Sequence, residues 1–458
     1  MASSRKPAPE ELAEHVARSL RARIRPGRRL TVALSGGADS VTLLHLLTGL
    51  AGPLGFELSA FHVNHGLSPR ADAWEAFCRR LCHELGVPFD GRRVSVDRCG
   101  GLGLEAAARE ARYRAFGELE TDYLALAHHR DDQAETLLLQ LLRGAGPRGA
   151  AGMASERALR GSGVTLLRPL LDVSRAALRA YAAAYALVWV DDESNVDPAR
   201  ARTFVRHDWL PMAMQRFPGA DAALARAARL QGEAAVLLED LAAMDGAGAM
   251  VPGRLALARL LALAPPRGRN LLRHFLGRHG LPAPPERRLD EFLRQARTAA
   301  ADGRVRLDLP GWQLFVWREG VWLVRGAAPA TPIVWRGEAE LEPGGGRGRL
   351  TLRPVVGAGL CAEQARAGGI VVGWRVGGER LQRRPGGPHH RLKVLLQEVG
   401  VPPWMRDRLP LVFVGGQLAW VPGLGPDAGK APGAGEAGWM AEWVPEPGFG
   451  TDGRPLTW

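Results

Sequence analysis

The segment from Thr31 to Ser40, Thr-Val-Ala-Leu-Ser-Gly-Gly-Ala-Asp-Ser, predicts a buried strand that ends in a glycine loop and opens directly onto a helix. The N–H groups of such a loop and of the helix start converge on one spot, where the helix dipole adds partial positive charge. Gly36 and Gly37 leave the backbone open to a ligand because they carry no Cβ. The segment therefore predicts a phosphate-binding loop, although an ordinary strand-to-helix turn with a glycine pair would give the same pattern.

This loop lacks the lysine that reaches the outer phosphates in the common phosphate-binding loop, so it is poorly suited to transfer of the terminal phosphoryl group. The pattern Ser-Gly-Gly-Xaa-Asp-Ser instead resembles the PP-loop ATP pyrophosphatases, which cleave between the α- and β-phosphates. The resemblance implies that Asp39 binds Mg²⁺. It also implies that the loop holds the pyrophosphate portion of ATP, through Ser35, Gly36, Gly37, Ala38, Asp39 and Ser40.

Two further polar clusters follow apolar, strand-like runs. The run Phe56 to Phe61 leads into His62-Val-Asn64-His65-Gly-Leu67, and the run Tyr123 to Ala127 leads into His-His-Arg-Asp131-Asp132-Gln-Ala-Glu135-Thr. In an open parallel sheet, ligands bind beyond the carboxyl ends of the strands. We therefore expect the three clusters to converge on one crevice, whereas any single cluster could be a helix cap or a satisfied core group.

These motifs, in this order, resemble those of the tRNA(Ile)-lysidine synthetase family. The resemblance extends over most of residues 29 to 216 and reappears near the end of the chain. Its further elements are Glu105 to Tyr113, Leu141 to Gly144 with Gly152-Met153, Asp192 to Asp197 with Arg202, Arg206 and Pro211, Trp404 to Pro410, and Trp420 to Gly425. One departure is Thr203, which stands where the resemblance leads us to expect asparagine.

The resemblance implies a ligase that modifies the wobble cytidine of tRNA(Ile) with a CAU anticodon. ATP would adenylylate the cytidine 2-oxygen and release pyrophosphate, and free L-lysine would then displace AMP to form lysidine. The ε-amine of lysine has a pKa of about 10.4, so its binding as a cation and its deprotonation call for carboxylates. Asp131, Asp132 and Glu135 are the candidates, and Asp131 and Glu135 lie one helical turn apart, which predicts a shared face.

Catalytic roles are thus expected for Asp39, His65, Asp131, Asp132 and Glu135, and the resemblance adds His62 and Asn64 to the ATP-binding residues. Cationic side chains form a second group, expected to contact tRNA: Arg112, Arg143, Arg202, Arg206, Arg380, Arg383, Arg384, Lys393, Arg406 and Arg408. The first four could equally contact ATP phosphates. The later ones lie near Trp374, Trp404 and Trp420 in the sequence, which suggests a surface that binds RNA phosphates and offers rings for base stacking. A solvated basic face over core tryptophans would give the same sequence pattern.

Apolar runs alternating with helical stretches predict an α/β N-terminal domain with a parallel sheet, and the resemblance implies that it is of the PP-loop type. A mostly helical domain and a small α+β C-terminal domain would follow it. We expect the catalytic domain over 1–215, a helical domain closed by a β-hairpin over 216–328, a tRNA-binding domain over 332–430, and a loose tail over 431–458. The one helix expected in the C-terminal domain covers Leu392 to Val399.

The formal net charge of +12 over 458 residues favours a polyanionic partner. The four cysteines do not suggest a disulfide framework, and no apolar run approaches about 18 residues, so we expect a cytoplasmic protein without a membrane partner. A PP-loop tRNA thiolase would need catalytic cysteines, an amidotransferase would need a glutaminase domain, and a catalytically inactive tRNA-binding protein is the remaining alternative. A homodimer is one assembly that the sequence leaves open.

Overall fold

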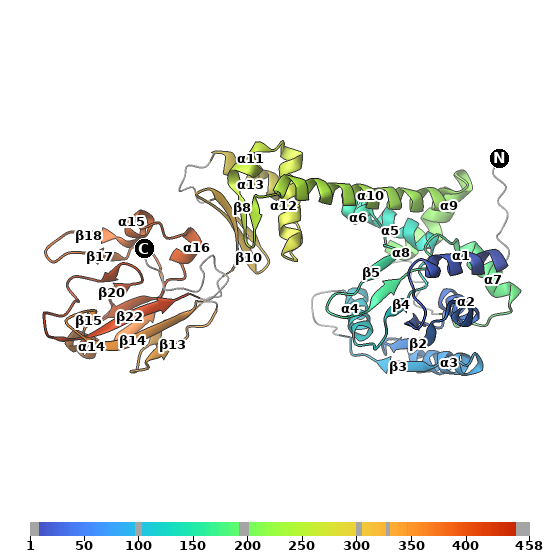
Figure 1. Cartoon of the computed structure of the whole chain (residues 1–458), viewed down its shortest axis with the longest axis horizontal. Helices are drawn as coiled ribbons and strands as arrows, with labels where there is room; N and C mark the ends of the chain where they lie inside the picture. Colours follow the sequence, from blue (N-terminus) through green and yellow to red (C-terminus); the bar gives the residue numbers. More distant parts are fainter. Residues whose placement is uncertain are drawn as a thin grey trace. The chain divides into compact units, whose positions relative to one another are not determined.

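A computed structural model describes residues 9–96, 103–191, 201–298, 305–326, 330–345 and 347–445. The chain divides into two compact units, Met1–Leu237 and Leu238–Trp458. The division lies within a long helix, α10 (Ala220–Gly246), whose first part belongs to the first unit (Figure 1). The first unit therefore extends beyond the boundary expected near residue 215.

The first unit is built on a six-stranded sheet in the order β3-β2-β1-β4-β6-β5. Its strands are β1 (Arg29–Ala33), β2 (Glu57–Asn64), β3 (Phe89–Arg93), β4 (Tyr123–Ala125), β5 (Glu156–Ala158) and β6 (Thr165–Leu167). All pairs are parallel except β5 with β6. The strand order reverses between β1 and β4, which is where an open α/β sheet leaves a crevice for a ligand. The expected α/β fold with a parallel sheet is confirmed.

Seven helices of the first unit precede residue 192 among the described residues. They are α1 (Pro9–Arg21), α2 (Ala38–Leu54), α3 (Ala71–Glu84), α4 (Leu104–Gly117), α5 (Arg130–Leu142), α6 (Pro147–Ala150) and α7 (Arg175–Ala184). Side chains of α1, α2, α3 and α7 share one core with alternate sheet residues such as Leu30 and Val32. On the opposite face α4 packs through Phe116 against Phe61 and Leu124. The sheet is covered on both faces, which is why its strands are so apolar.

A run of helix follows from residue 201. It consists of α8 (Ala201–Phe204), a π-helical turn η2 (Val205–Trp209), α9 (Leu210–Arg216) and then α10. A π-turn inserts one residue into the helical repeat and is frequent at functional sites. Here it carries Arg206, one turn after Arg202 of α8.

The middle part of the chain forms three helices against an antiparallel sheet in the order β7-β8-β11-β10-β9. Its elements are β7 (Met250–Val251), β8 (Arg254–Ala256), α11 (Leu257–Ala262), α12 (Pro265–Arg278), α13 (Glu286–Thr298), β9 (Arg306–Leu309), β10 (Trp312–Trp317) and β11 (Gly320–Arg325). The expected hairpin is present as β10 and β11. The expectation of a domain that is helical apart from its closing hairpin is wrong for β7 and β8. These strands are too short to show a period and depend on pairing, β8 with β11 and β7 with β8.

The C-terminal part contains two larger sheets, in the orders β12-β16-β19-β20-β21 and β13-β14-β22-β15, and the hairpin β17-β18. The strands are β12 (Ile333–Val334), β13 (Glu340–Leu341), β14 (Arg349–Val356), β15 (Leu360–Cys361), β16 (Ile370–Gly373), β17 (Arg380–Gln382), β18 (His389–Arg391), β19 (Leu411–Val414), β20 (Gln417–Val421), β21 (Gly425–Pro426) and β22 (Ala437–Val444). The helices are α14 (Ala362–Gly368), α15 (Leu392–Glu398) and α16 (Pro403–Arg406). The helix expected from Leu392 is thus confirmed as α15.

The expectation of a loose tail from residue 431 is wrong for β22. This strand pairs with β14 from Arg349–Val444 to Val356–Ala437 and also pairs with β15. Trp443 is buried, and its indole N–H donates to the carbonyl oxygen of Arg347 at 2.7 Å. The glycine-rich residues before β22 gave no sign of a strand, because its partner β14 lies far earlier in the chain. Residues after 445 lie outside the described part of the chain. No helix that the structure describes is long and apolar enough to cross a bilayer.

Candidate active site at the carboxyl ends of the parallel strands

The loop after β1 is held in a fixed shape by its two serines. Ser40 donates its hydroxyl to the Gly37 carbonyl oxygen at 2.9 Å and accepts the Ser35 N–H at 3.2 Å. Gly36 has φ +89°, and a Cβ there would lie 2.9 Å from Val190 Cγ2 and 3.2 Å from Cys78 Sγ. A side chain at this position would meet both strain and a clash, so the loop requires glycine.

Asp39 lies in the first turn of α2 and reaches the crevice between β1 and β4. Its Oδ2 is 3.6 Å from Nε2 of His129, whereas its Oδ1 is buried without a hydrogen-bond partner. A carboxylate oxygen is a ligand that Mg²⁺ prefers. In the described part of the chain, no three His, Cys, Asp or Glu side chains are grouped to hold a metal. The unpartnered Oδ1 of Asp39 therefore fits a ligand of Mg²⁺.

His129, just beyond β4, is the buried cation of this crevice. Its Nδ1 lies 3.6 Å from Asp131 Oδ2, and its Nε2 lies 3.5 Å from Asp132 Oδ2 as well as close to Asp39. Burial lowers the pKa of His129, but the neighbouring carboxylates of Asp131, Asp39 and Asp132 raise it to about 10. His129 is therefore an imidazolium at neutral pH. Sequence reasoning placed it in a motif without giving it a role, because charge depends on the carboxylates that surround a group.

The last residues of β2, and His65 directly after it, shape the crevice from the other side of β1. His62 donates its Nδ1–H to the Leu34 carbonyl oxygen at 2.8 Å, and Asn64 donates to Asp72 at 2.8 Å. Both side chains are buried, so in this structure they hold the loops after β1 and β2 together. Burial lowers the pKa of His65, and the charge of Arg112 lowers it further. His65 is thus neutral at pH 7, with its Nδ1 buried and without a partner.

Asp132 and Glu135 of α5 form a compact ion cluster with two arginines that follow seventy residues later. Arg202 donates to Glu135 at 2.8 Å and to Asp132 at 3.0 Å, while Arg206 donates to the same two carboxylates at 2.6 and 2.9 Å. Both carboxylates are buried. Burial raises the pKa of Asp132, but the cations His129 and Arg202 hold it below its usual value. The structure thus places two proposed catalytic acids and two proposed phosphate contacts in one cluster.

Asp131 contacts different groups from Glu135, although both lie on α5. Its Oδ2 accepts the backbone N–H of Arg175 at 2.9 Å, which is the first residue of α7. The shared face expected from the spacing therefore does not make one site of these two carboxylates. Asp131 accepts a hydrogen bond from the start of α7 and lies beside His129, whereas Glu135 pairs with Arg202 and Arg206.

His128 is a further residue of the crevice that sequence reasoning did not select. Burial lowers its pKa to about 3, and the charges of Arg168 and Arg112 contribute to that shift against the effect of Asp132. Its Nδ1 is buried without a hydrogen-bond partner. Its place shortly after β4, among the polar residues beyond that strand, was the available signal. Arg168, which follows β6, gave no sequence signal beyond that same kind of position.

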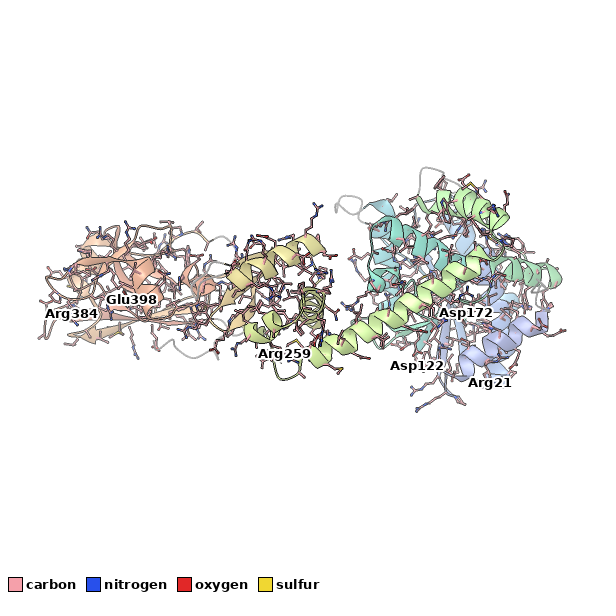
Figure 2. All side chains as sticks on the ribbon, turned by 90° about the horizontal axis from the view of Figure 1, so that it is seen from above. Arg21, Asp122, Asp172, Arg259, Arg384 and Glu398 are labelled. Carbon is pink, nitrogen blue, oxygen red and sulfur yellow. The ribbon has the colours of Figure 1, made fainter. Side chains whose placement is uncertain are left out.

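The C-terminal cations separate into exposed and buried groups. Arg380, Arg383 and Arg384 lie exposed on the β17–β18 hairpin, and Lys393 is exposed on α15. Figure 2 shows Arg384 at the surface of this part. Two others do not belong to that surface. Arg406 is half-buried and donates to the Val401 carbonyl oxygen at 2.8 Å, and Arg408 is 3% exposed and donates to the carbonyl oxygen of Arg325.

The tryptophans near these cations also differ from the expected stacking platforms. Trp404 and Trp420 are buried in the hydrophobic core of the C-terminal part. Trp404 lies against Trp317 and Trp322 of the preceding sheet, with ring centroids 5.6 and 5.4 Å apart. Apolar packing rather than base stacking accounts for them. In the first unit Arg143 is exposed just after α5, and Asp192 to Asp197 lie outside the described residues.

Comparisons with known proteins agree with this architecture. Family models match in three places: a PP-loop domain at residues 10–213, the TilS substrate binding domain at 255–322 and the TilS substrate C-terminal domain at 370–443. The tRNA(Ile)-lysidine synthase of Nitrosomonas europaea is 40% identical over 97% of this chain and 98% of that protein. The chain belongs to the tRNA(Ile)-lysidine synthase family.

Other members of the tRNA(Ile)-lysidine synthase family are also similar over nearly their whole length. That of Aromatoleum aromaticum is 46% identical over 92% of this chain and 99% of its own, and that of an Azoarcus species is 44% identical over 95% and 96%. The resemblance inferred from the motifs is thereby confirmed. This family membership also identifies the chain as a ligase with a PP-loop domain.

Proposed function

We infer that this chain forms lysidine at the wobble cytidine of tRNA(Ile) with a CAU anticodon, by ATP-dependent ligation of free lysine. The observation that carries the proposal is the juxtaposition, at the switch point of the sheet, of a phosphate loop with a buried carboxylate pair. The first suits activation by ATP, and the second suits recognition of an amine. Similarity to lysidine synthases over nearly the whole chain supports the same assignment.

The first step would activate the cytidine carbonyl. Its 2-oxygen attacks the α-phosphorus of ATP, a new P–O bond forms, the bond between the α-phosphorus and the bridging oxygen breaks, and pyrophosphate leaves. The N–H groups of the loop from Ser35 to Ser40 and the start of α2 would stabilise the departing charge. His129, a cation beside Asp39, adds positive charge at the same place.

We propose Asp39 as the protein ligand of Mg²⁺, through the buried Oδ1 that has no partner. When bound, the ion would neutralise charge on the phosphate oxygens as a Lewis acid. Asp39 would remain paired to His129 through its other oxygen. One side chain would thus fix both the ion and the imidazolium.

The second step would transfer lysine. Its ε-amine attacks C2 of the cytidine, the C–O bond to AMP breaks, and AMP leaves. We propose that Asp132 and Glu135 bind the amine as its ammonium. The ion pairs of these carboxylates with Arg202 and Arg206 would break when lysine binds. The amine must lose a proton before attack, and His65, neutral at pH 7, is the proposed acceptor.

Binding of the tRNA is proposed to be divided between the two units. The exposed cations of the β17–β18 hairpin and Lys393 would contact phosphates of the tRNA body. Arg112 and Arg143 of the first unit remain proposed contacts of ATP or tRNA. A substrate of this kind also supports a cytoplasmic location, which we propose.

A homodimer is proposed on a separate observation. Leu230, Leu237 and Met244 of α10 are exposed apolar residues at intervals of seven, the spacing of a two-helix seam. A second copy of this chain would cover them. Light scattering should then report twice the mass of the chain, and Leu237→Glu should return the protein to one copy. A single-copy mass for the unmodified protein would refute the dimer.

The thiolase alternative is not favoured. Cys78 and Cys82 are buried, and burial raises the pKa of Cys78 to about 12 and that of Cys82 to about 11. A catalytic thiol needs the opposite shift, because the thiolate is the nucleophile. Both cysteines therefore pack in the hydrophobic core beneath the phosphate loop.

The test is to incubate the purified chain with tRNA(Ile) transcript, ATP and isotopically labelled lysine, and then to analyse the nucleosides by mass spectrometry. We expect labelled lysidine and an equal amount of AMP, and none of either when ATP is omitted. A sulfur-containing nucleoside would support the thiolase. Tight tRNA binding without AMP or pyrophosphate release would support an inactive RNA-binding protein.

A further inference from the structure

Arg168 is a buried cation at the edge of the crevice, and neither proposed step uses it. It follows β6 directly and is 4% exposed. Its Nη1 donates to the Ala154 carbonyl oxygen at 2.6 Å, and its Nε is buried without a hydrogen-bond partner. A buried guanidinium is costly unless something compensates it. Besides burial, the groups that most affect its pKa are Tyr113, Arg157 and Arg109.

Two of these arginines, Arg109 and Arg157, lie over the ring of Tyr113, and Tyr113 also affects the pKa of Arg168. Arg109, one turn earlier on α4, donates to the Tyr113 hydroxyl at 3.3 Å, and its Cζ lies 5.0 Å from the ring centroid. Arg157 of β5 places its Cζ 5.6 Å from the same centroid. Burial lowers the pKa of Arg168, Tyr113 raises it, and the charges of Arg157 and Arg109 lower it further. We call Arg109, Arg157 and Arg168, with Tyr113, the Tyr113 arginine cluster.

The side chains of the cluster become more buried from the surface towards the active site. Arg109 and Arg157 are exposed, Tyr113 is half-buried and Arg168 is buried. β6 pairs in parallel with β4, so Arg168 emerges at the same edge of the sheet as His128. The charge of Arg168 also lowers the pKa of His128.

The position of the cluster separates it from the proposed ATP site. The phosphate loop follows β1, and β6 lies two strands away in the order β1-β4-β6. At a strand spacing of about 4.8 Å, the two sites are roughly 10 Å apart along the sheet. The polynucleotide whose cytidine must enter the crevice is long enough to reach both.

We propose that the Tyr113 arginine cluster binds a backbone phosphodiester of the RNA strand that carries the modified cytidine, and so holds that nucleotide in the crevice. The inference rests on the proposed function. The guanidinium is the side chain best matched to a phosphate, because its planar fork can donate two parallel hydrogen bonds. The exposed Arg109 and Arg157 would attract the RNA strand. The buried Arg168 would donate a hydrogen bond to the phosphate through its unpartnered Nε.

The test compares single variants in binding to an anticodon stem-loop RNA across a series of salt concentrations, and in steady-state turnover. We expect Arg109→Ala and Arg157→Ala each to weaken binding roughly tenfold and to flatten the log–log salt slope by about 0.7, the value for one lost contact to a single strand. KM for tRNA should rise while KM for ATP stays unchanged. Arg168→Lys, which keeps the charge but loses the fork, should also raise KM for tRNA.

Arg114→Ala is the matched control. It removes one exposed arginine from the same helix, and Arg114 lies 3.6 Å from Glu110 rather than at the cluster. We expect its salt slope and both KM values to equal those of the unmodified protein. Thermal melting of every variant separates loss of fold from loss of contact, and Arg109→Ala and Arg157→Ala should melt normally because both residues are exposed.

Two results would overturn the inference. Unchanged salt slopes and KM for tRNA in Arg109→Ala and Arg157→Ala would show a solvated surface, and a rise in KM for ATP instead would assign the cluster to the nucleotide. Failure of the proposed function would look different, since the unmodified protein would then bind the stem-loop without producing lysidine.

Discussion

His129 and Asp39 form an ion pair across the switch point of the sheet, with 3.6 Å between His129 Nε2 and Asp39 Oδ2. Asp39 belongs to the helix after β1, and His129 follows β4. The same imidazole also faces Asp131 and Asp132. One buried cation therefore links the proposed ATP site to the proposed lysine site, and this arrangement has consequences for both stability and activity.

Stability should depend on pH through His129. Its pKa is raised from 6.5 to about 10 in the folded protein, so the stabilisation is complete below about pH 6.5 and is lost as the pH rises through about 10. We expect the free energy of unfolding, measured by urea titration at a series of pH values, to fall between about pH 7 and about pH 10. The fall should be shallower in His129→Gln. Parallel curves for the two proteins would contradict the assigned cation.

Asp39→Ala should abolish most of the activity while the fold is kept. The substitution removes the proposed Mg²⁺ ligand, and a few kcal/mol of lost charge stabilisation lowers turnover roughly 10²-fold or more. Pyrophosphate release in the presence of tRNA measures the first step directly, and circular dichroism checks the fold. Near-normal pyrophosphate release would place the metal elsewhere.

Glu135→Gln should separate the two steps of the proposed reaction. The change weakens the carboxylate pair proposed to hold the lysine amine and leaves the phosphate loop untouched. We expect adenylylated tRNA to accumulate while lysine transfer fails, as followed by mass analysis of the nucleosides. If adenylylation were lost together with transfer, Asp132 and Glu135 would belong to ATP or magnesium binding.

Asp131→Ala offers a comparison on the same helix. Asp131 accepts the first N–H of α7, so its loss should lower stability by about 1 kcal/mol, as measured by thermal melting. Normal stability of this variant would indicate that the contact to Arg175 contributes little.

The effect of replacing a C-terminal arginine should depend on whether that arginine is exposed or buried. Arg383→Ala with Arg384→Ala removes two exposed charges, so tRNA binding should weaken and its log–log salt slope should flatten by about one unit or slightly less for each contact. ATP affinity should not change. Arg408→Ala should instead lower the free energy of unfolding by about 2 kcal/mol or more, because it empties a buried site and leaves the Arg325 carbonyl oxygen unsatisfied. An unchanged slope in the double variant would move the tRNA site to the first unit.

The sequence by itself determined the features that depend on local chemistry. A strand, a glycine pair and an acidic helix start are recognisable within ten residues, which is why the loop from Ser35 to Ser40 was predicted. The order of the motifs determined the family, and the alternation of apolar runs determined the parallel sheet. Each of these signals lies in a short segment, because backbone conformation and periodicity are local properties.

The tertiary structure alone decided which charges meet. Arg202 and Arg206 were predicted to bind phosphates, yet they hold Asp132 and Glu135 from about seventy residues away. Arg408 and Arg383 look alike in sequence, but one is buried and the other exposed. β22 exists because β14 pairs with it. Such outcomes depend on distances between residues that are remote along the chain, and Coulomb energy, burial and strand pairing are all set by those distances.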